Sequence, residues 1–137
     1  MTQTAITTAQ AETVLAAATA RSNEIGVPVN IALLDAGAHL KAFRRMDGAV
    51  LGSIDVAIGK ARTAVLFDAR SEAVWEYCKP GAPAPGLELT NGGLVAFGGG
   101  IPLRGRNTLT LGAVGISGGT VAQDTEIAEA AAAALAV

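Results

Sequence analysis

The sequence predicts an α+β fold, an α/β sandwich in which helices pack against an antiparallel sheet of five strands. Apolar residues recur at helical spacing in several segments, and extended segments rich in apolar and β-branched residues lie between them. Some of these extended segments follow one another across short turns, as the strands of a hairpin do. Hairpin-joined strands pair antiparallel, so the order α-β-β-α-α-β-β-β-α is favoured over a wound parallel sheet.

Helix signals are clearest at the start of the chain. Thr7 and Gln10 have the spacing of a capping box, in which each side chain bonds the backbone N–H of the other residue. Gly26 supplies the stop, because glycine readily adopts the left-handed conformation that ends many helices. The elements expected up to Cys78 are a helix between Thr7 and Gly26, strands over 29–34 and 39–45 around a turn at 35–38, and helices over 53–67 and 71–78.

The second half of the chain opens with a long loop over 79–93. Three prolines, Pro80, Pro83 and Pro85, alternate with small residues in it, and a loop of this length is typical of a lid or a binding loop. The elements expected after it are strands over 94–97, 101–103 and 108–117, with a bend at 98–100, and a helix from Thr120 to the C-terminus.

The composition is that of a single packed domain over residues 1–137. Half of the residues are hydrophobic, the mean hydropathy is +0.42 and only 16% are charged, which excludes a disordered chain. Aromatic residues, which bury the largest areas, make up only 4%, and 17 residues are glycines without a side chain. The average residue therefore buries little area. A chain this apolar with so few charges is expected to hide further surface between subunits, which predicts a homo-oligomer.

The same counts exclude or disfavour several partners. The net charge is −2 and the ten Lys and Arg are scattered, so no basic patch for nucleic acid is expected. One cysteine and one histidine exclude a disulfide framework and a cysteine-cluster zinc site, and no metal site made of protein ligands alone is expected. Because no apolar stretch is long enough to span a bilayer and no secretion signal is recognised, we expect a cytoplasmic protein without a membrane role.

The sharpest local feature is the turn over 117–120. A strand is expected to end there and a helix to begin, so free backbone N–H groups beside glycines suit an anion such as a carboxylate. The alternative is that Thr120 and Gln123 cap the helix and use those donors themselves. The candidate ligand-binding residues, taken from this turn and from the long loop, are Glu88, Asn91, Ser117, Gly118, Gly119 and Thr120.

His39 and Lys60 are the titratable side chains expected closest to that turn. His39, the only imidazole, ends a tight hairpin where Asp35 can fix its tautomer; the alternative is a half-exposed histidine at a strand end. Lys60 lies on an apolar stripe of its helix, where burial lowers a lysine pKa; the alternative is an ordinary lysine that extends its ammonium to water. Both are candidate catalytic acid/base groups. The pocket is expected between the 80–93 loop, the His39 hairpin end and 117–120, either within one subunit or completed by a neighbouring one.

Six segments, spread in order over the whole chain, carry a family resemblance. They are Gly26-Val27-Pro28-Val29, Leu34-Asp35-Ala36-Gly37-Ala38-His39-Leu40, Phe43-Arg44-Arg45-Met46-Asp47-Gly48-Ala49, Ser53-Ile54-Asp55-Val56-Ala57, Phe97-Gly98-Gly99-Gly100-Ile101-Pro102-Leu103 and Gly115-Ile116-Ser117-Gly118-Gly119-Thr120. Together they resemble the GlcG/HbpS family, which includes the C-terminal domain of PduO-type proteins. The resemblance implies an α/β sandwich with a five-stranded antiparallel sheet, assembled into homo-oligomers from tetramers to octamers.

The resemblance also implies a cofactor, because some relatives bind haem. Haem-binding relatives of the PduO type use a histidine on the first helix, and this chain has none between Thr7 and Gly26. Haem is therefore expected to bind more weakly here than in those relatives. The side chains left as its iron ligand are His39, Met46, Tyr77 or a hydroxyl such as that of Thr120.

Two functions with a ligand or substrate follow from these observations, and a purely structural subunit is the third alternative. The first is a small-molecule-binding protein, with haem or a carboxylate as its ligand and its pocket at the 117–120 turn and the 80–93 loop. The second is a cofactor-independent enzyme acting on a small carboxylate or carbonyl compound. In that enzyme His39 or Lys60 is the acid/base group and the backbone amides of the turn hold an oxyanion.

Overall fold

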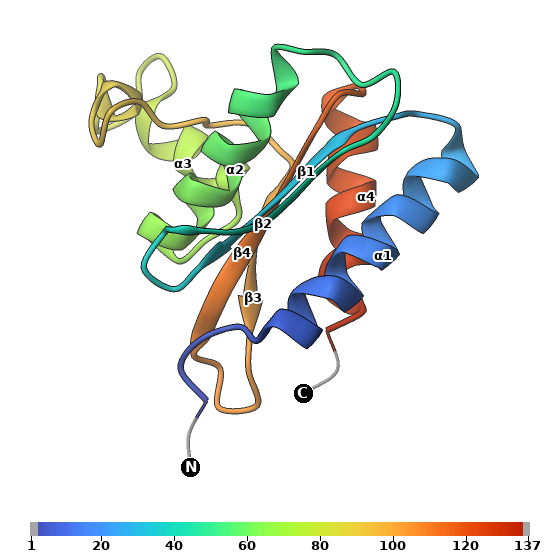
Figure 1. Ribbon diagram of the computed structural model, residues 1–137. Coiled ribbons are helices and arrows are strands. Elements are labelled where there is room, and N and C mark those ends of the chain that lie inside the picture. Colours follow the sequence, from blue (N-terminus) through green and yellow to red (C-terminus); the bar gives the residue numbers. More distant parts are fainter. Residues whose placement is uncertain (1–2, 136–137) are drawn as a thin grey trace.

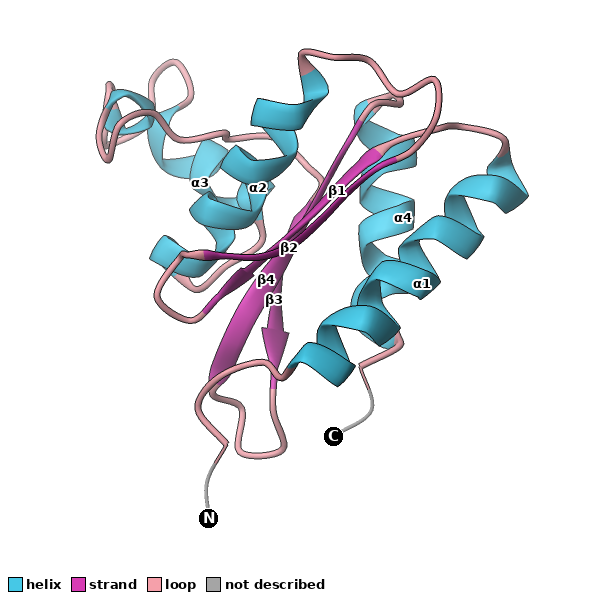
Figure 2. Cartoon of the chain, in the orientation of Figure 1, coloured by secondary structure: helices cyan, strands magenta, loops and turns pink. Residues whose placement is uncertain are grey.

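Four helices, four strands and one short 3-10 helix make up the computed structural model, which describes residues 3–135 (Figure 1; Figure 2). Within these residues no helix is both long enough and apolar enough to cross a membrane. The elements are α1 (Thr8–Ile25), β1 (Asn30–Asp35), β2 (Leu40–Arg45), α2 (Ser53–Phe67), α3 (Ser71–Cys78), η1 (Leu87–Leu89), β3 (Gly100–Arg104), β4 (Thr110–Ser117) and α4 (Val121–Ala133).

The strands form one antiparallel sheet in the order β2-β1-β4-β3. Each outer strand is the hairpin partner of the inner strand beside it, and the central pair joins the two hairpins. In that pair Asn30 lies opposite Ser117, and Asp35 lies opposite Gly112. This register places the turn between β1 and β2 at one end of the sheet and the end of β4 at the other.

Helices cover both faces of the sheet, with α1 and α4 on one face and α2 and α3 on the other (Figure 1). The side under α1 and α4 buries branched aliphatic side chains, among them Val14, Ile31 and Ile127. The side under α2 buries smaller ones, mostly alanines such as Ala57 and Ala61. The small side chains let the backbone of α2 come close to the sheet.

Most ends of the helices lie where the sequence predicts them. The capping boxes at the starts of α1 and α4 both form, and α1 ends at Gly26, which has a φ of 74°. The second and third helices span 53–67 and 71–78, as predicted. Both ends of α1 and the start of α4 follow from short-range signals, which depend little on the rest of the fold.

The prediction of a fifth strand over 94–97 is wrong, because this segment is irregular. Its backbone bonds hydroxyl groups of the neighbouring helices instead of another strand. The N–H of Val95 donates to Thr63 Oγ1 of α2 at 3.0 Å. The carbonyl of Phe97 accepts from Ser71 Oγ of α3 at 2.7 Å. The described sheet therefore has four strands, and the segment before β3 belongs to the layer of α2 and α3.

Candidate functional site

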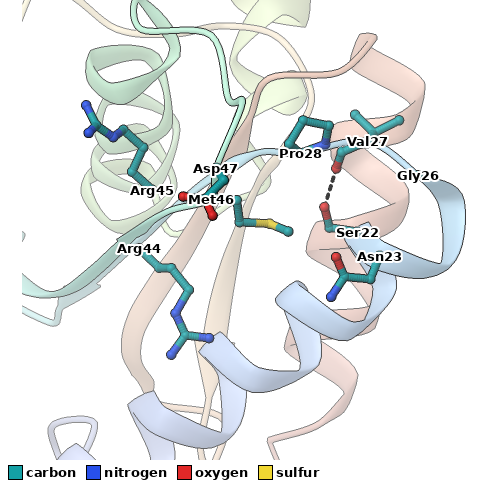
Figure 3. Close-up of a pocket in the computed structure, with 9 residues that line it drawn as sticks. All are labelled: Ser22, Asn23, Gly26, Val27, Pro28, Arg44, Arg45, Met46 and Asp47. Carbon is teal, nitrogen blue, oxygen red and sulfur yellow. Dashed lines mark hydrogen bonds between the residues drawn. The ribbon is translucent and has the colours of Figure 1, made fainter.

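A pocket of about 530 Å³ opens between the end of α1, the loop that follows it and the end of β2 (Figure 3). Its volume is in the range of small-molecule sites. The α1–β2 pocket, as we call it, is lined by Ser22, Asn23, Gly26, Val27, Pro28, Arg44, Arg45, Met46 and Asp47.

The wall on the helix side is fixed by the way in which α1 ends. Gly26 stops the helix in the left-handed conformation, and its N–H donates to the Ser22 carbonyl at 2.9 Å. The Ser22 hydroxyl in turn donates to the carbonyl of Val27 (Figure 3). These two hydrogen bonds hold the first residues of the loop against the end of the helix, and so they fix the shape of this wall.

The opposite wall depends on side-chain alternation along β2 and just beyond it. Successive side chains of a strand point to opposite faces, so Arg44 and Met46 face α1 while Arg45 points away (Figure 3). Arg44 Nη1 donates to Thr19 Oγ1 of α1 at 2.9 Å, which holds the guanidinium beside the helix. Met46 is half-buried and packs against the core beneath α1 and α4.

Beside the charged Arg45 and Asp47, two of the side chains that line this pocket are suited to bind a ligand. The thioether sulfur of Met46 is a soft, neutral ligand of the kind that iron and copper accept. The guanidinium of Arg44 is a permanent cation that pairs well with a carboxylate. The arrangement can hold an organic anion, and it can supply one ligand to a metal complex that has an open coordination position.

His39 lies at the far end of the sheet from the 117–120 turn. Its side chain is 82% exposed, and its Nδ1 is 3.5 Å from Asp35 Oδ1. Backbone N–H groups of His39 and Gly37 donate to the same carboxylate and lower the pKa of Asp35, against the smaller opposing effect of burial. The β1–β4 register separates this hairpin end from the turn. The pocket predicted between His39, 117–120 and the 80–93 loop is therefore not formed within one chain.

Three backbone donors at the start of α4 bond side chains of this chain. The N–H of Gly119 donates to Asp124 Oδ1 at 2.8 Å. Thr120 and Gln123 form the capping box, with the Thr120 N–H donating to Gln123 Oε1 at 2.9 Å and the Gln123 N–H donating to Thr120 Oγ1 at 3.1 Å. Of the two alternatives for this turn, the structure shows the capping one.

Ser117 and Gly118 shape the chain between β4 and α4. Ser117 is buried and ends β4 opposite Asn30. Gly118 has a φ of 144°, and a Cβ at this position would lie 2.9 Å from the Pro28 carbonyl oxygen. A side chain at position 118 would strain the backbone, so this glycine is needed by the turn itself.

Lys60 is fully buried, with 0% of its side chain exposed. Its Nζ donates to the Ile116 carbonyl at 2.8 Å and to Asp124 Oδ2 at 3.0 Å, so it connects α2 to α4 past the end of β4. Burial lowers the pKa of Lys60, and the carboxylate of Asp124 opposes that shift. Of the two alternatives for Lys60, the structure shows the buried one. An ammonium enclosed in this way has no contact with a substrate in solution.

Glu88 lines a second pocket, of about 520 Å³, beside the first turn of α4. Asn91 does not line it, and its carbonyl accepts instead from the guanidinium of Arg62. The structure therefore brings Glu88, but not Asn91, next to the start of α4. The α3 pocket, as we call it, is lined by Glu72, Trp75, Glu88, Leu94, Ala96, Phe97, Gly98 and Val121.

Sequence patterns do not single out Arg44, Trp75 or Phe97, which line these two pockets. A pair of adjacent arginines is ordinarily a solvated surface, although the alternation of Ala42, Arg44 and Met46 is a signal for their common face. No comparable signal exists for Phe97, because hydroxyl groups of two helices position its irregular segment.

Comparison with known proteins finds relatives over nearly the whole chain. Residues 6–133 match the family model described as "Haem degrading protein HbpS-like". The "Uncharacterized 15.0 kDa protein in dhaT-dhaS intergenic region" of Citrobacter freundii is 41% identical over 127 residues, which cover 92% of this chain and 89% of that protein.

Two further similarities are to PduO-type proteins. The corrinoid adenosyltransferase PduO of Citrobacter freundii is 43% identical over 120 residues, which cover 87% of this chain but 36% of that protein. The crystal structure described as "PduOC:Heme Complex" is 36% identical and superposes with a TM-score of 0.89, covering 95% of this chain and 94% of the other.

Proposed function

The chain belongs to the HbpS-like family, and from this premise we propose that it binds haem in the α1–β2 pocket. One observation carries the proposal: Met46, a candidate iron ligand, lines a pocket that α1 borders. The family resemblance puts the haem ligand of PduO-type relatives on the first helix, and a relative of that type forms a solved heme complex. Haem held against the same helix here would meet Met46.

The other three candidate ligands are less well placed for a site on α1. His39 is at the exposed end of the β1–β2 hairpin, and the hydroxyl of Thr120 caps α4. Tyr77 lines a smaller pocket of about 310 Å³ formed by the end of α2, α3 and the long loop, on the other side of the sheet from α1.

The residues present fit the group. A methionine sulfur is an accepted axial ligand of haem iron in cytochromes, and the guanidinium of Arg44 can pair with a propionate. Val27 and Pro28 add apolar surface on which a flat ring can lie. Haem, when bound, supplies a redox-active iron, and the role of the chain is to hold it and to set its ligand.

Haem titration followed by Soret absorbance tests the proposal. We expect Met46→Ala to weaken binding by roughly tenfold or more, because it removes the iron ligand. His39→Ala is the matched control and should leave the affinity unchanged, since its ring is far from this pocket. A saturable complex that survives Met46→Ala with equal affinity would contradict the assignment, as would the absence of any saturable complex in the unchanged protein.

The same titration can test the position of the site when a histidine is introduced into α1. Asn23 lines the pocket and is exposed, so Asn23→His should tighten binding. Thr13 is exposed on the same helix, ten residues earlier or about 15 Å along the axis, so Thr13→His should have no effect. Equal effects of the two histidines would show that the haem does not lie at the end of α1.

A further inference from the structure

We propose that the α3 pocket is a second ligand site, and that it takes an organic cation consisting of an aromatic ring with an amino group. It shares no lining residue with the α1–β2 pocket. An experiment that rejects one of the two sites therefore does not count against the other.

Three large apolar side chains that line the pocket are partly exposed to solvent, and each comes from a different segment of the chain. Trp75 of α3 is 45% exposed, Phe97 of the irregular segment 46% and Val121 of α4 49%. Leu94, which also lines the pocket, is buried. Aromatic walls around a recess of this size are typical of sites that bind a small ring compound.

The Phe97 ring packs against a group that the chain itself holds in place. On its buried side Lys60 Nζ lies 5.1 Å from the ring centroid. That ammonium is itself held by Asp124, and the backbone carbonyl of Phe97 accepts from Ser71. A ring that is already ordered loses little conformational entropy when a ligand packs on it.

The charged groups that line the pocket are both carboxylates, Glu72 and Glu88. Glu72 Oε1 is paired with Arg70 Nε at 2.5 Å, while its Oε2 is shielded from water and has no hydrogen-bond partner among residues 3–135. Glu88 forms no ion pair with any of the residues that the structure describes. A carboxylate without a cation at the edge of an aromatic recess favours a ligand that brings the cation. An anionic ligand would be repelled.

The chain provides its own probe for the experiment, because Trp75 is its single tryptophan. Trp75 fluorescence is measured during titration with 2-phenylethylamine, and in parallel with 2-phenylethanol and phenylacetate, which have similar shape but charges of zero and −1. We expect saturable binding of the amine, binding of the alcohol weaker by roughly tenfold, and no saturation with the carboxylate. Equal affinities for the three compounds, or no response to the amine, would overturn the proposal.

Variants on the pocket edge make the test specific. Glu88→Gln removes the unpaired charge and should weaken amine binding by roughly fivefold or more. Glu76→Gln, an exposed glutamate on the same helix as Trp75, is the matched control and should have no effect. An unchanged affinity in Glu88→Gln, with native circular dichroism, would overturn the proposal. So would a Trp75 emission that follows protein concentration and ignores the amine, because a second copy of the chain would then cover the pocket.

Discussion

Asp124→Ala is expected to lower the free energy of unfolding by about 3–5 kcal/mol, because it leaves the ammonium of Lys60 buried without its carboxylate. Lys60 is 0% exposed, so water cannot replace the lost partner. The variant also removes the acceptor of the Gly119 N–H at the start of α4. Urea unfolding followed by circular dichroism measures the loss.

Two further variants show that burial is the cause. The double variant Lys60→Met with Asp124→Leu removes both charges and should recover most of the stability, because a buried pair replaced by apolar groups is often neutral. Glu129→Ala breaks the exposed pair with Arg70 Nη1 and should cost less than about 1 kcal/mol. A cost for Asp124→Ala as small as that of Glu129→Ala would contradict this account of the pair.

The same pair predicts the sign of a pH dependence. Burial holds the folded-state pKa of Lys60 below its ordinary value of 10.5, and removal of Asp124 lowers it further. Between the lowered pKa and 10.5 the unfolded chain binds a proton that the folded chain does not. The contribution of Lys60 to the free energy of unfolding therefore rises with pH across that window, and the rise should be larger in Asp124→Ala.

Gly115→Val is expected to destabilise the fold by about 3 kcal/mol, because β4 and α2 are in backbone contact at this residue. A Cβ at position 115 would lie against the carbonyl oxygen of Ala57 and 2.7 Å from the backbone nitrogen of Ala61. The backbone on both sides is held in regular structure, so neither neighbour can move without disturbing its element. Thermal unfolding measures the effect.

Gly52→Val is the matched control for this substitution. Gly52 precedes α2 with a φ of −61°, and a Cβ there would meet no atom of the described part of the chain within 4 Å. The same added volume should therefore change stability by less than about 1 kcal/mol at this position. A similar loss in both variants would mean that general effects of valine, and not the contact with α2, cause the destabilisation.

Local signals predicted the elements whose ends depend on nearby residues. The capping box at Thr7 and the left-handed Gly26 bound α1, and α2 spans 53–67 as its apolar periodicity predicts. The segment 94–97 is apolar enough for a strand, but Thr63 and Ser71 of two distant helices bond its backbone. Such long-range hydrogen bonds leave no pattern in a single sequence, which is why a fifth strand was predicted.

The candidate site was harder to predict, because it depends on how the strands are ordered. The lowered pKa of Lys60 follows from its position on an apolar stripe, but its pairing with Asp124 needs the arrangement of α2 and α4 around β4. His39 and the 117–120 turn were expected together, and only the antiparallel β1–β4 register shows that they lie at opposite ends. Met46 was one of four candidates for the iron ligand, and its place beside α1 depends on the pairing of β2 with β1.

NMR of the haem-loaded protein, labelled with carbon-13 at the methionine methyl groups, tests most directly whether Met46 is the iron ligand. The chain has two methionines, and Met46→Leu identifies the signal of Met46 by its loss. Carbon monoxide is added to the reduced protein to fill the open coordination position, which makes the ferrous iron diamagnetic, and the ring current of the porphyrin then moves the methyl group of an iron-bound methionine far upfield. We predict this shift for Met46 at one equivalent of haem. A Met46 methyl signal that stays at its haem-free position while haem is bound would contradict the proposed site.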